Sequence, residues 1–177
     1  VRLTSDDLDT DVERFRSRTE AKSTSLVIGE PREGALETPG GKRRGWRSAG
    51  VSGGNGVNPF LIQHDEAGEA LRNRLYGDLP PKSHPLGYGR IDRLEVVFSS
   101  LAEGESYFRD GYGLERVGEQ SVCPSRQGDR VFFPLSDGQL EVIAPNSADS
   151  PLQDFVAHRG YGLRGVVLTV PDPDADR

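Results

Sequence analysis

The chain has 177 residues, a formal net charge of −6 and a hydrophobic share of 34%, which allows one sizeable core or two small ones. Its lysines and arginines are scattered among the acids, so no broad basic face is available to neutralise a phosphate backbone. No apolar run approaches the roughly 20 residues of a membrane-spanning helix, and the N-terminus lacks a secretory signal pattern. We therefore expect neither nucleic acid nor a membrane as a partner.

Glycine and proline are abundant, with 22 and 12 copies, which favours turns and short strands over long helices. The single cysteine, Cys123, excludes an internal disulfide and fits a reducing cytoplasm. The chain starts at Val1 without a methionine and ends in PDPDADR just after a strand-like run. We therefore expect both ends to be cuts within a longer sequence.

A strand-to-helix junction recurs along the chain, first as LTSDDLDTDVERF (3–15) and again as VFSSLAEGESYF (97–108). In both copies a polar pair that can cap a helix precedes a leucine, and a phenylalanine follows that leucine by seven residues. Seven residues make two helical turns, so each leucine and phenylalanine share one helix face. A third copy begins at 168–177 and is cut off.

Three strand candidates follow each complete junction, and turns rich in glycine separate them. They are LVIGE (26–30), GWRSAGV (45–51) and PFLIQ (59–63) in the first copy, and ERVGE (115–119), RVFFPL (130–135) and LEVIA (140–144) in the second. The order is therefore β-α-β-β-β, twice. We expect a first module at 1–66 with a truncated first strand, a linker at 67–90, a second module at 91–147, and a connecting helix with the start of a further module at 148–177.

The sequence resembles the vicinal oxygen chelate superfamily, which includes glyoxalases, methylmalonyl-CoA epimerases, extradiol dioxygenases and bleomycin-resistance proteins. The stretches that carry the resemblance are RIDRLEVVFSSLAEGESYFRDGYGLERVGE (90–119), DGQLEVIAP (137–145) and GLRGVVLTVPD (162–172). Shorter pieces before residue 90, such as NPFLIQHDE (58–66), resemble the second half of glyoxalase-like members. The resemblance implies an α+β fold whose tandem βαβββ modules form a cupped, mostly antiparallel mixed sheet around a small molecule.

The family holds a divalent metal ion, such as Zn, Mn, Fe or Ni, with side chains on the first and fourth strands of its modules. Carried over by position, the first-strand ligands fall on Arg93 and Gly165, and the fourth-strand ligands on Phe60 and Glu141. Arginine stays protonated and cannot bind a cation. Glu141 is therefore the one family-like metal ligand that this chain retains, and we expect the metal site to be mostly erased.

Two interpretations of Arg93 stay open. It replaces the charge of the metal and pairs with Glu141 or with the carboxylate of a ligand, or it forms a structural salt bridge. Glu141 and His64 are the candidate catalytic groups, although His64 also suits a solvated loop position. Trp46 and Phe60 are expected in the ligand-binding wall of the cup or in the core.

These features lead to a glyoxalase-like protein that acts on or holds a small metabolite, with metal-dependent lyase, isomerase or dioxygenase chemistry in the full-length protein. The alternatives are a module that sequesters a ligand without turnover, as bleomycin-resistance relatives do, and a structural module pair. Whether the protein is an enzyme stays open. The expected partners are a small-molecule ligand and either a second copy of the chain or modules outside this sequence.

Overall fold

The computed structural model describes residues 2–37, 40–41, 43–54, 57–66, 70, 90–135 and 138–169. The chain divides into two compact units: unit 1 is Val1–Gly54 with Asn58–Lys82, and unit 2 is Asn55–Val57 with Ser83–Arg177. Nearly all of the expected linker at 67–90 lies outside the described residues. Among the residues that are described, none of the helices has the length and apolar character to cross a bilayer.

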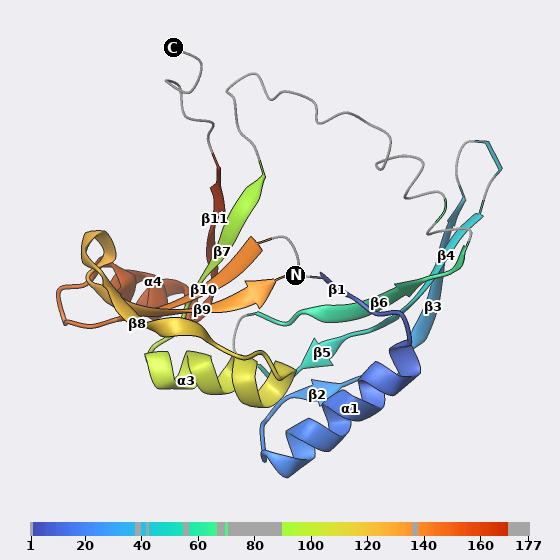
Figure 1. The fold of residues 1–177 in the computed structure, drawn as a ribbon, viewed down its shortest axis with the longest axis horizontal. Helices are drawn as coiled ribbons and strands as arrows, with labels where there is room; N and C mark the ends of the chain where they lie inside the picture. Colours follow the sequence, from blue (N-terminus) through green and yellow to red (C-terminus); the bar gives the residue numbers. More distant parts are fainter. Residues whose placement is uncertain are drawn as a thin grey trace. The chain divides into compact units, whose positions relative to one another are not determined.

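Unit 1 is built on a four-stranded mixed sheet with one long helix. Its elements are β1 (Arg2–Thr4), α1 (Leu8–Ala21), β2 (Val27–Ile28), β3 (Arg32–Glu37), β4 (Arg43–Ala49), β5 (Val51–Ser52) and β6 (Phe60–His64). The strand order is β1-β6-β4-β3, in which β1 runs parallel to β6 and the other neighbours are antiparallel (Figure 1). The first strand therefore lies beside the last one.

Helix α1 begins where the sequence predicts a helix start. The Asp7 carboxylate accepts a hydrogen bond of 3.2 Å from the Thr10 backbone N–H, a cap that contributes about 1 kcal/mol. Leu8, Val12 and Phe15 recur at helical spacing and are all buried. The predicted pairing of Leu8 and Phe15 on one helix face is confirmed.

The second strand of the unit 1 sheet lies later in the chain than predicted. The segment at 26–30 forms only β2, which pairs with β5 in a separate two-stranded ladder. The place beside β4 is taken by β3, whose residues are mostly exposed. Because its sequence, REGALE, shows no apolar alternation, only its backbone pairing with β4 defines it as a strand.

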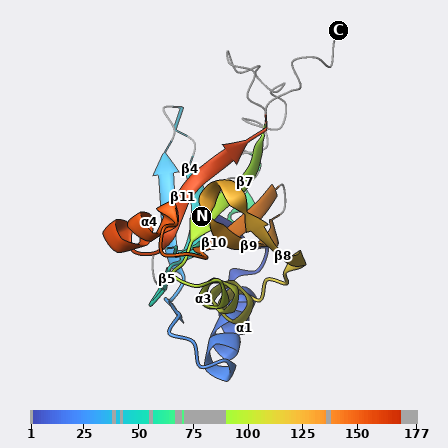
Figure 2. The same ribbon diagram turned by 90° about the vertical axis from the view of Figure 1, so that its left-hand side faces the viewer.

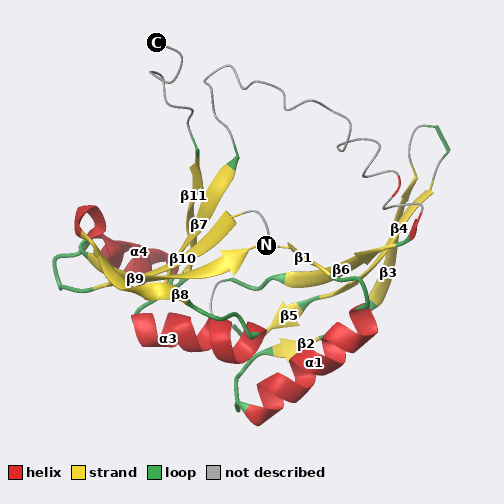
Figure 3. Ribbon diagram, viewed as in Figure 1, coloured by secondary structure: helices red, strands yellow, loops and turns green. Residues whose placement is uncertain are grey.

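Unit 2 contains the complete β-α-β-β-β order that the sequence predicts. Its elements are β7 (Ile91–Val97), α3 (Leu101–Ser106), a π-helical turn η1 (Tyr107–Gly111), β8 (Val117–Cys123), a 3₁₀ turn η2 (Pro124–Arg126), β9 (Gly128–Leu135), β10 (Gly138–Pro145), α4 (Pro151–Arg159) and β11 (Gly162–Leu168). Helices and strands are distinguished in Figure 3. The expected α+β class with mostly antiparallel mixed sheets is confirmed.

The unit 2 sheet has the order β11-β7-β10-β9-β8. β7 and β10 are parallel, and the remaining neighbours are antiparallel. β11, the predicted first strand of the third copy, runs antiparallel beside β7 (Figure 2). The start of the third copy is thus an integral edge strand of this sheet.

The main core of unit 2 lies between the sheet and α3. Phe98, Val131, Phe133 and Val142 are at most 1% exposed and pack in one cluster with the residues that follow α3. Full burial of such side chains contributes about 1.5 to 3 kcal/mol each. Gly104 lets α3 approach closely, because an added Cβ would lie 2.4 Å from Val142 Cγ1.

Helix α4 covers one end of the opposite sheet face. The Ser150 hydroxyl caps it by accepting from the Leu152 N–H, and Pro151 occupies the first helical position. Leu152 is fully buried and packs with Val97 and Ile143. These two strand residues alternate with the ones that face α3, so α4 and α3 lie on different faces of the sheet.

Candidate functional site

The sheet face of unit 2 that α3 does not cover carries four charged residues in its middle, which we call the charged face. Arg93 and Glu95 come from β7, Arg130 from β9 and Glu141 from β10. The strand register places them on one face. Glu141 is the partner of Glu95, and Arg93 and Arg130 are the partners of Gln139 and Ile143, each two residues from Glu141 on β10. The face contains residues 93 and 141, around which the sequence predicts a small-molecule cavity.

Glu141 is the most buried charged residue of this face, at 1% exposure. Arg93 Nε donates to Glu141 Oε2 at 2.5 Å, and Arg130 Nη1 donates to Oε1 at 3.2 Å. Each carboxylate oxygen therefore has its own guanidinium partner. A buried carboxylate is costly unless it is paired and hydrogen-bonded, and the two arginines meet that requirement.

The register explains why both arginines reach the same carboxylate. Arg93 is the partner of Gln139 on β10, and Arg130 is the partner of Ile143. Gln139 and Ile143 lie two residues before and two residues after Glu141, so the arginines approach it from both sides along the strand. The arrangement joins two consecutive strands, β9 and β10, to β7, which lies far earlier in the sequence.

Arg93 has a second carboxylate partner, since its Nη1 donates to Asp92 Oδ2 at 2.7 Å. Partial burial lowers the pKa of Arg93, but the hydrogen bonds to Glu141 and Asp92 outweigh it, so the pKa lies above its ordinary value. The guanidinium is thus a permanent cation. This is incompatible with a role as a metal ligand.

Arg130 is held by different groups. Its Nε donates to the Ser121 hydroxyl at 3.3 Å, and its guanidinium carbon lies 5.3 Å from the centre of the Phe132 ring. The ring adds a cation–π attraction of about 0.5 to 1 kcal/mol. Among the described residues, Arg130 is therefore fixed in place by Glu141, Ser121 and Phe132.

A second buried carboxylate lies next to the first. Glu95 is 4% exposed and accepts a hydrogen bond from Arg164 Nη1 on β11. Arg126 Nη2, from η2, lies 3.7 Å from its other oxygen. Like charges on neighbouring strands repel, so the two glutamates are tolerated because each has its own arginines.

The side chains at the family's metal positions do not fit a divalent ion. In unit 2, Arg93 donates to the one retained carboxylate ligand, Glu141, and Gly165 has no side chain. Phe60, in unit 1, is apolar. No group of three His, Cys, Asp or Glu side chains that could hold a metal lies within the described parts of the chain. A bound ion needs three or more donors, and here an arginine occupies the position of one of them.

Unit 1 places three predicted residues on one sheet face. Trp46 of β4 is the register partner of His64 on β6. Phe60 lies four residues before His64 on β6, so both side chains point to the same face. Phe60 is 37% exposed. The Trp46 indole lies over Gly34, where an added Cβ would be 2.6 Å from the ring. These aromatic and imidazole groups thus belong to one surface.

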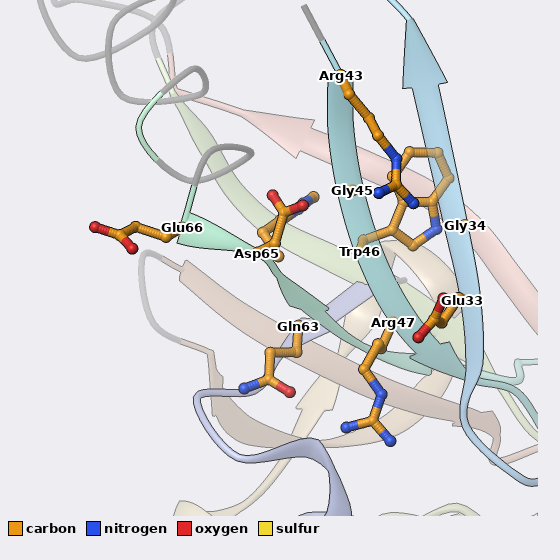
Figure 4. A pocket seen from close by; sticks show the side chains of 10 residues that line it. Glu33, Gly34, Arg43, Gly45, Trp46, Arg47, Gln63, Asp65 and Glu66 are labelled. Atoms are coloured by element: carbon orange, nitrogen blue, oxygen red, sulfur yellow. The ribbon is translucent and has the colours of Figure 1, made fainter.

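A pocket of about 410 Å³ opens in unit 1 at the ends of β3, β4 and β6 (Figure 4). Arg47 and Gln63 line it, but both are engaged with the start of α1. Arg47 donates twice to the Asp9 carboxylate at 2.8 Å, and Gln63 donates to the Asp6 carbonyl at 2.6 Å. Trp46 and His64 belong to the lining, while Phe60 does not.

From the sequence, Glu141 was one of the partners considered for Arg93, and the structure brings the two residues into contact. The sequence did not identify Arg130, Glu95 or Arg164. The signal for Arg130 and Glu95 was available, because each is a charged residue directly before an apolar run of its strand. Such a residue on a sheet face needs a partner.

Comparison with known proteins gives distant sequence matches. No family model matches the chain. It is 27% identical over 79 residues to the protein YqjC of Bacillus subtilis, which covers 45% of this chain and 56% of that protein. It is also 27% identical over 88 residues to the mitochondrial methylmalonyl-CoA epimerase of Mus musculus, covering 49% of each.

A solved structure, the methylmalonyl-CoA epimerase of Mycobacterium tuberculosis, is 20% identical with a TM-score of 0.46, covering 52% of this chain and 62% of that one. The chain spans about half the length of the curated relatives that it matches. The matches to the epimerases agree with the β-α-β-β-β order of unit 2 and with the family-like stretches in the sequence. The chain is therefore distantly similar in sequence to methylmalonyl-CoA epimerases, in line with its resemblance to the vicinal oxygen chelate (glyoxalase) superfamily.

Proposed function

We propose that the charged face of unit 2 binds a small anionic metabolite and that Arg93 and Arg130 receive its carboxylate. One observation carries the proposal: two guanidinium groups from different strands converge on a single carboxylate, that of Glu141. The planar fork of donors on arginine matches the geometry of a carboxylate better than an ammonium does. The guanidinium groups of Arg93 and Arg130, held in this way, are suited to bind the carboxylate of a ligand in addition to that of Glu141.

Both arginines keep donors for a ligand. Arg93 uses Nε and Nη1, and Arg130 uses Nε and Nη1. Neither Nη2 group donates to any residue in the described part of the chain. The two side chains are 29% and 27% exposed, so solvent reaches them. A ligand can therefore bind without displacing Glu141.

In this proposal Glu141 positions the arginines and does not act on the ligand. Both of its oxygens already accept hydrogen bonds from cations, which leaves it poorly suited to coordinate a metal. The function that these residues support is therefore binding without turnover. This corresponds to the sequestering class of the superfamily.

The named relatives suggest the chemical class of the ligand. The matched mammalian proteins are called methylmalonyl-CoA epimerases, and a methylmalonyl group carries a free carboxylate beside its thioester. A carboxylate-bearing metabolite is consistent with a pair of arginines. We extend only this class to the present chain.

The test is a titration of the purified chain with small carboxylates in the presence of EDTA. NMR signals of the arginine side chains report binding. We expect Arg93→Gln and Arg130→Gln each to weaken binding at least tenfold, since each removes a charge-assisted bond. The matched control is Arg116→Gln, because Arg116 pairs with Glu105 of α3 at 2.9 Å, away from the charged face. Equal weakening by the control, or no binding by the unaltered chain, would contradict the proposal.

A second candidate, isomerase chemistry on an acyl-CoA, is favoured by the similarity to the epimerases. Its test is exchange of the α-proton of methylmalonyl-CoA in deuterated water, with and without added divalent ions. Exchange above the buffer rate would support this candidate over binding alone. Exchange at the buffer rate under both conditions would exclude it for this chain.

A further inference from the structure

The charged face contains two arginine-bound carboxylates, side by side. Glu95 and Glu141 are register partners on the parallel strands β7 and β10. Their side chains point to the same side, and the strands are about 4.8 Å apart. Glu141 is bound by Arg93 and Arg130, and Glu95 by Arg164 with Arg126 nearby.

Arg164 and Arg126, the arginine pair at Glu95, have unused N–H donors, as Arg93 and Arg130 at Glu141 do. Arg164 donates to Glu95 through Nη1 alone. Arg126 contacts the other oxygen of Glu95 at 3.7 Å, which is an ion pair without a hydrogen bond. Their side chains are 26% and 39% exposed. Both guanidinium groups therefore have N–H groups and solvent access to offer a ligand.

The charge balance differs between the two glutamates. At Glu95 two arginines meet one carboxylate, which leaves a surplus of one positive charge. At Glu141 two arginines meet the buried carboxylate of Glu141 and the more exposed carboxylate of Asp92. A ligand carboxylate would balance the surplus at Arg164 and Arg126, and a second one would bind Arg93 and Arg130 through their Nη2 groups.

We infer that the ligand of the charged face is a dianion, a short dicarboxylate with one carboxylate at Arg93 and Arg130 and the other at Arg164 and Arg126. This inference rests on the function proposed above and specifies its ligand. Two carboxylates placed over neighbouring strands lie about 5 Å apart, the reach of roughly four or five carbons. A monocarboxylate satisfies one arginine pair only.

The experiment is a titration series in EDTA with matched acids: butyrate against succinate, pentanoate against glutarate, and malonate and adipate as the short and long limits. We expect succinate or glutarate to bind at least tenfold more tightly than its monocarboxylate. Malonate and adipate should bind more weakly than the best member of the series. A series without any preference for dicarboxylates overturns the inference and leaves the proposed function standing.

Variants separate the two arginine pairs. Arg164→Gln should remove the dicarboxylate preference and change monocarboxylate binding less than twofold, whereas Arg93→Gln should weaken both classes. If Arg164→Gln does not fold, the more exposed Arg126→Gln carries the same test. An unchanged preference in the folded variant overturns the inference. Failure of every carboxylate to bind the unaltered chain instead removes the proposed function itself.

Discussion

Arg93 and Glu141 lie on neighbouring parallel strands, and the Arg93 Nε reaches the Glu141 carboxylate at 2.5 Å. In the superfamily that the sequence resembles, metal ligands are expected at both of these positions. Here a fixed cation occupies the place of one ligand and neutralises the other. Arg93 thus pairs with the carboxylate that the resemblance implies as a metal ligand.

Removing the charge of Glu141 should destabilise unit 2. Glu141→Gln leaves Arg93 and Arg130 without their shared anion, and removal of one partner of a buried ion pair costs about 2 to 4 kcal/mol when the other partners are partly exposed. Urea unfolding followed by circular dichroism measures this loss. The control is Glu105→Gln, which breaks an exposed pair with Arg116 and should cost below about 1 kcal/mol. Equal losses for the two variants would show that burial of Glu141 is unimportant.

Divalent metal ions should not stabilise the unaltered chain. Addition of Zn, Mn or Ni should shift the melting temperature by less than about 1 °C, because a ligand stabilises only the state that it binds. The double variant Arg93→His with Gly165→His places two imidazoles near Glu141, and Gly165 has open space for a side chain. We expect it to bind Zn at least tenfold more tightly, as measured by calorimetry. A metal-dependent rise in the melting temperature of the unaltered chain would refute the interpretation that Arg93 prevents metal binding.

The close approach of α3 should make Gly104 intolerant of a side chain. Gly104→Ala puts a methyl group 2.4 Å from Val142 Cγ1 and 2.9 Å from Phe98 Cδ2. Overpacking of this kind costs about 1 to 3 kcal/mol. Gly165→Ala is the matched control, since an added Cβ there has no neighbour within 4 Å, and thermal unfolding compares the two. A neutral Gly104→Ala would mean that α3 lies farther from the sheet.

Unit 1 should lose an ionic contribution at acid pH. The hydrogen bonds from Arg47 hold the pKa of Asp9 below its ordinary value of 3.8. Because the pKa is lower in the folded state, the stabilisation is present above about pH 4 and is lost as the pH falls through the folded value. NMR titration of the Asp9 carboxyl should show its pKa rising in Arg47→Gln. The pKa of Asp7, lowered chiefly by the Thr10 hydroxyl, should move far less.

Local patterns predicted the element order well and the contacts between elements poorly. The repeated leucine and phenylalanine spacing identified the starts of α1 and α3, because helix caps and apolar periodicity are local properties. β3 escaped prediction because REGALE has no apolar alternation. The arginine partners of Glu141 and Glu95 depend on sheet register, which is set by pairing across long stretches of sequence. That is why one partner was identified from the family pattern and three were missed.

Each unit contains parallel strands that are distant in sequence, which affects how the protein folds. In unit 2, the contact between β7 and β10 joins residues that are 48 positions apart, and in unit 1 the Leu8 N–H reaches Gln63 across 55 positions. Such non-local contacts raise contact order and slow folding. During synthesis, neither sheet can close until its final strand has left the ribosome, so each unit spends that interval with an unpaired strand edge exposed to chaperones or to aggregation.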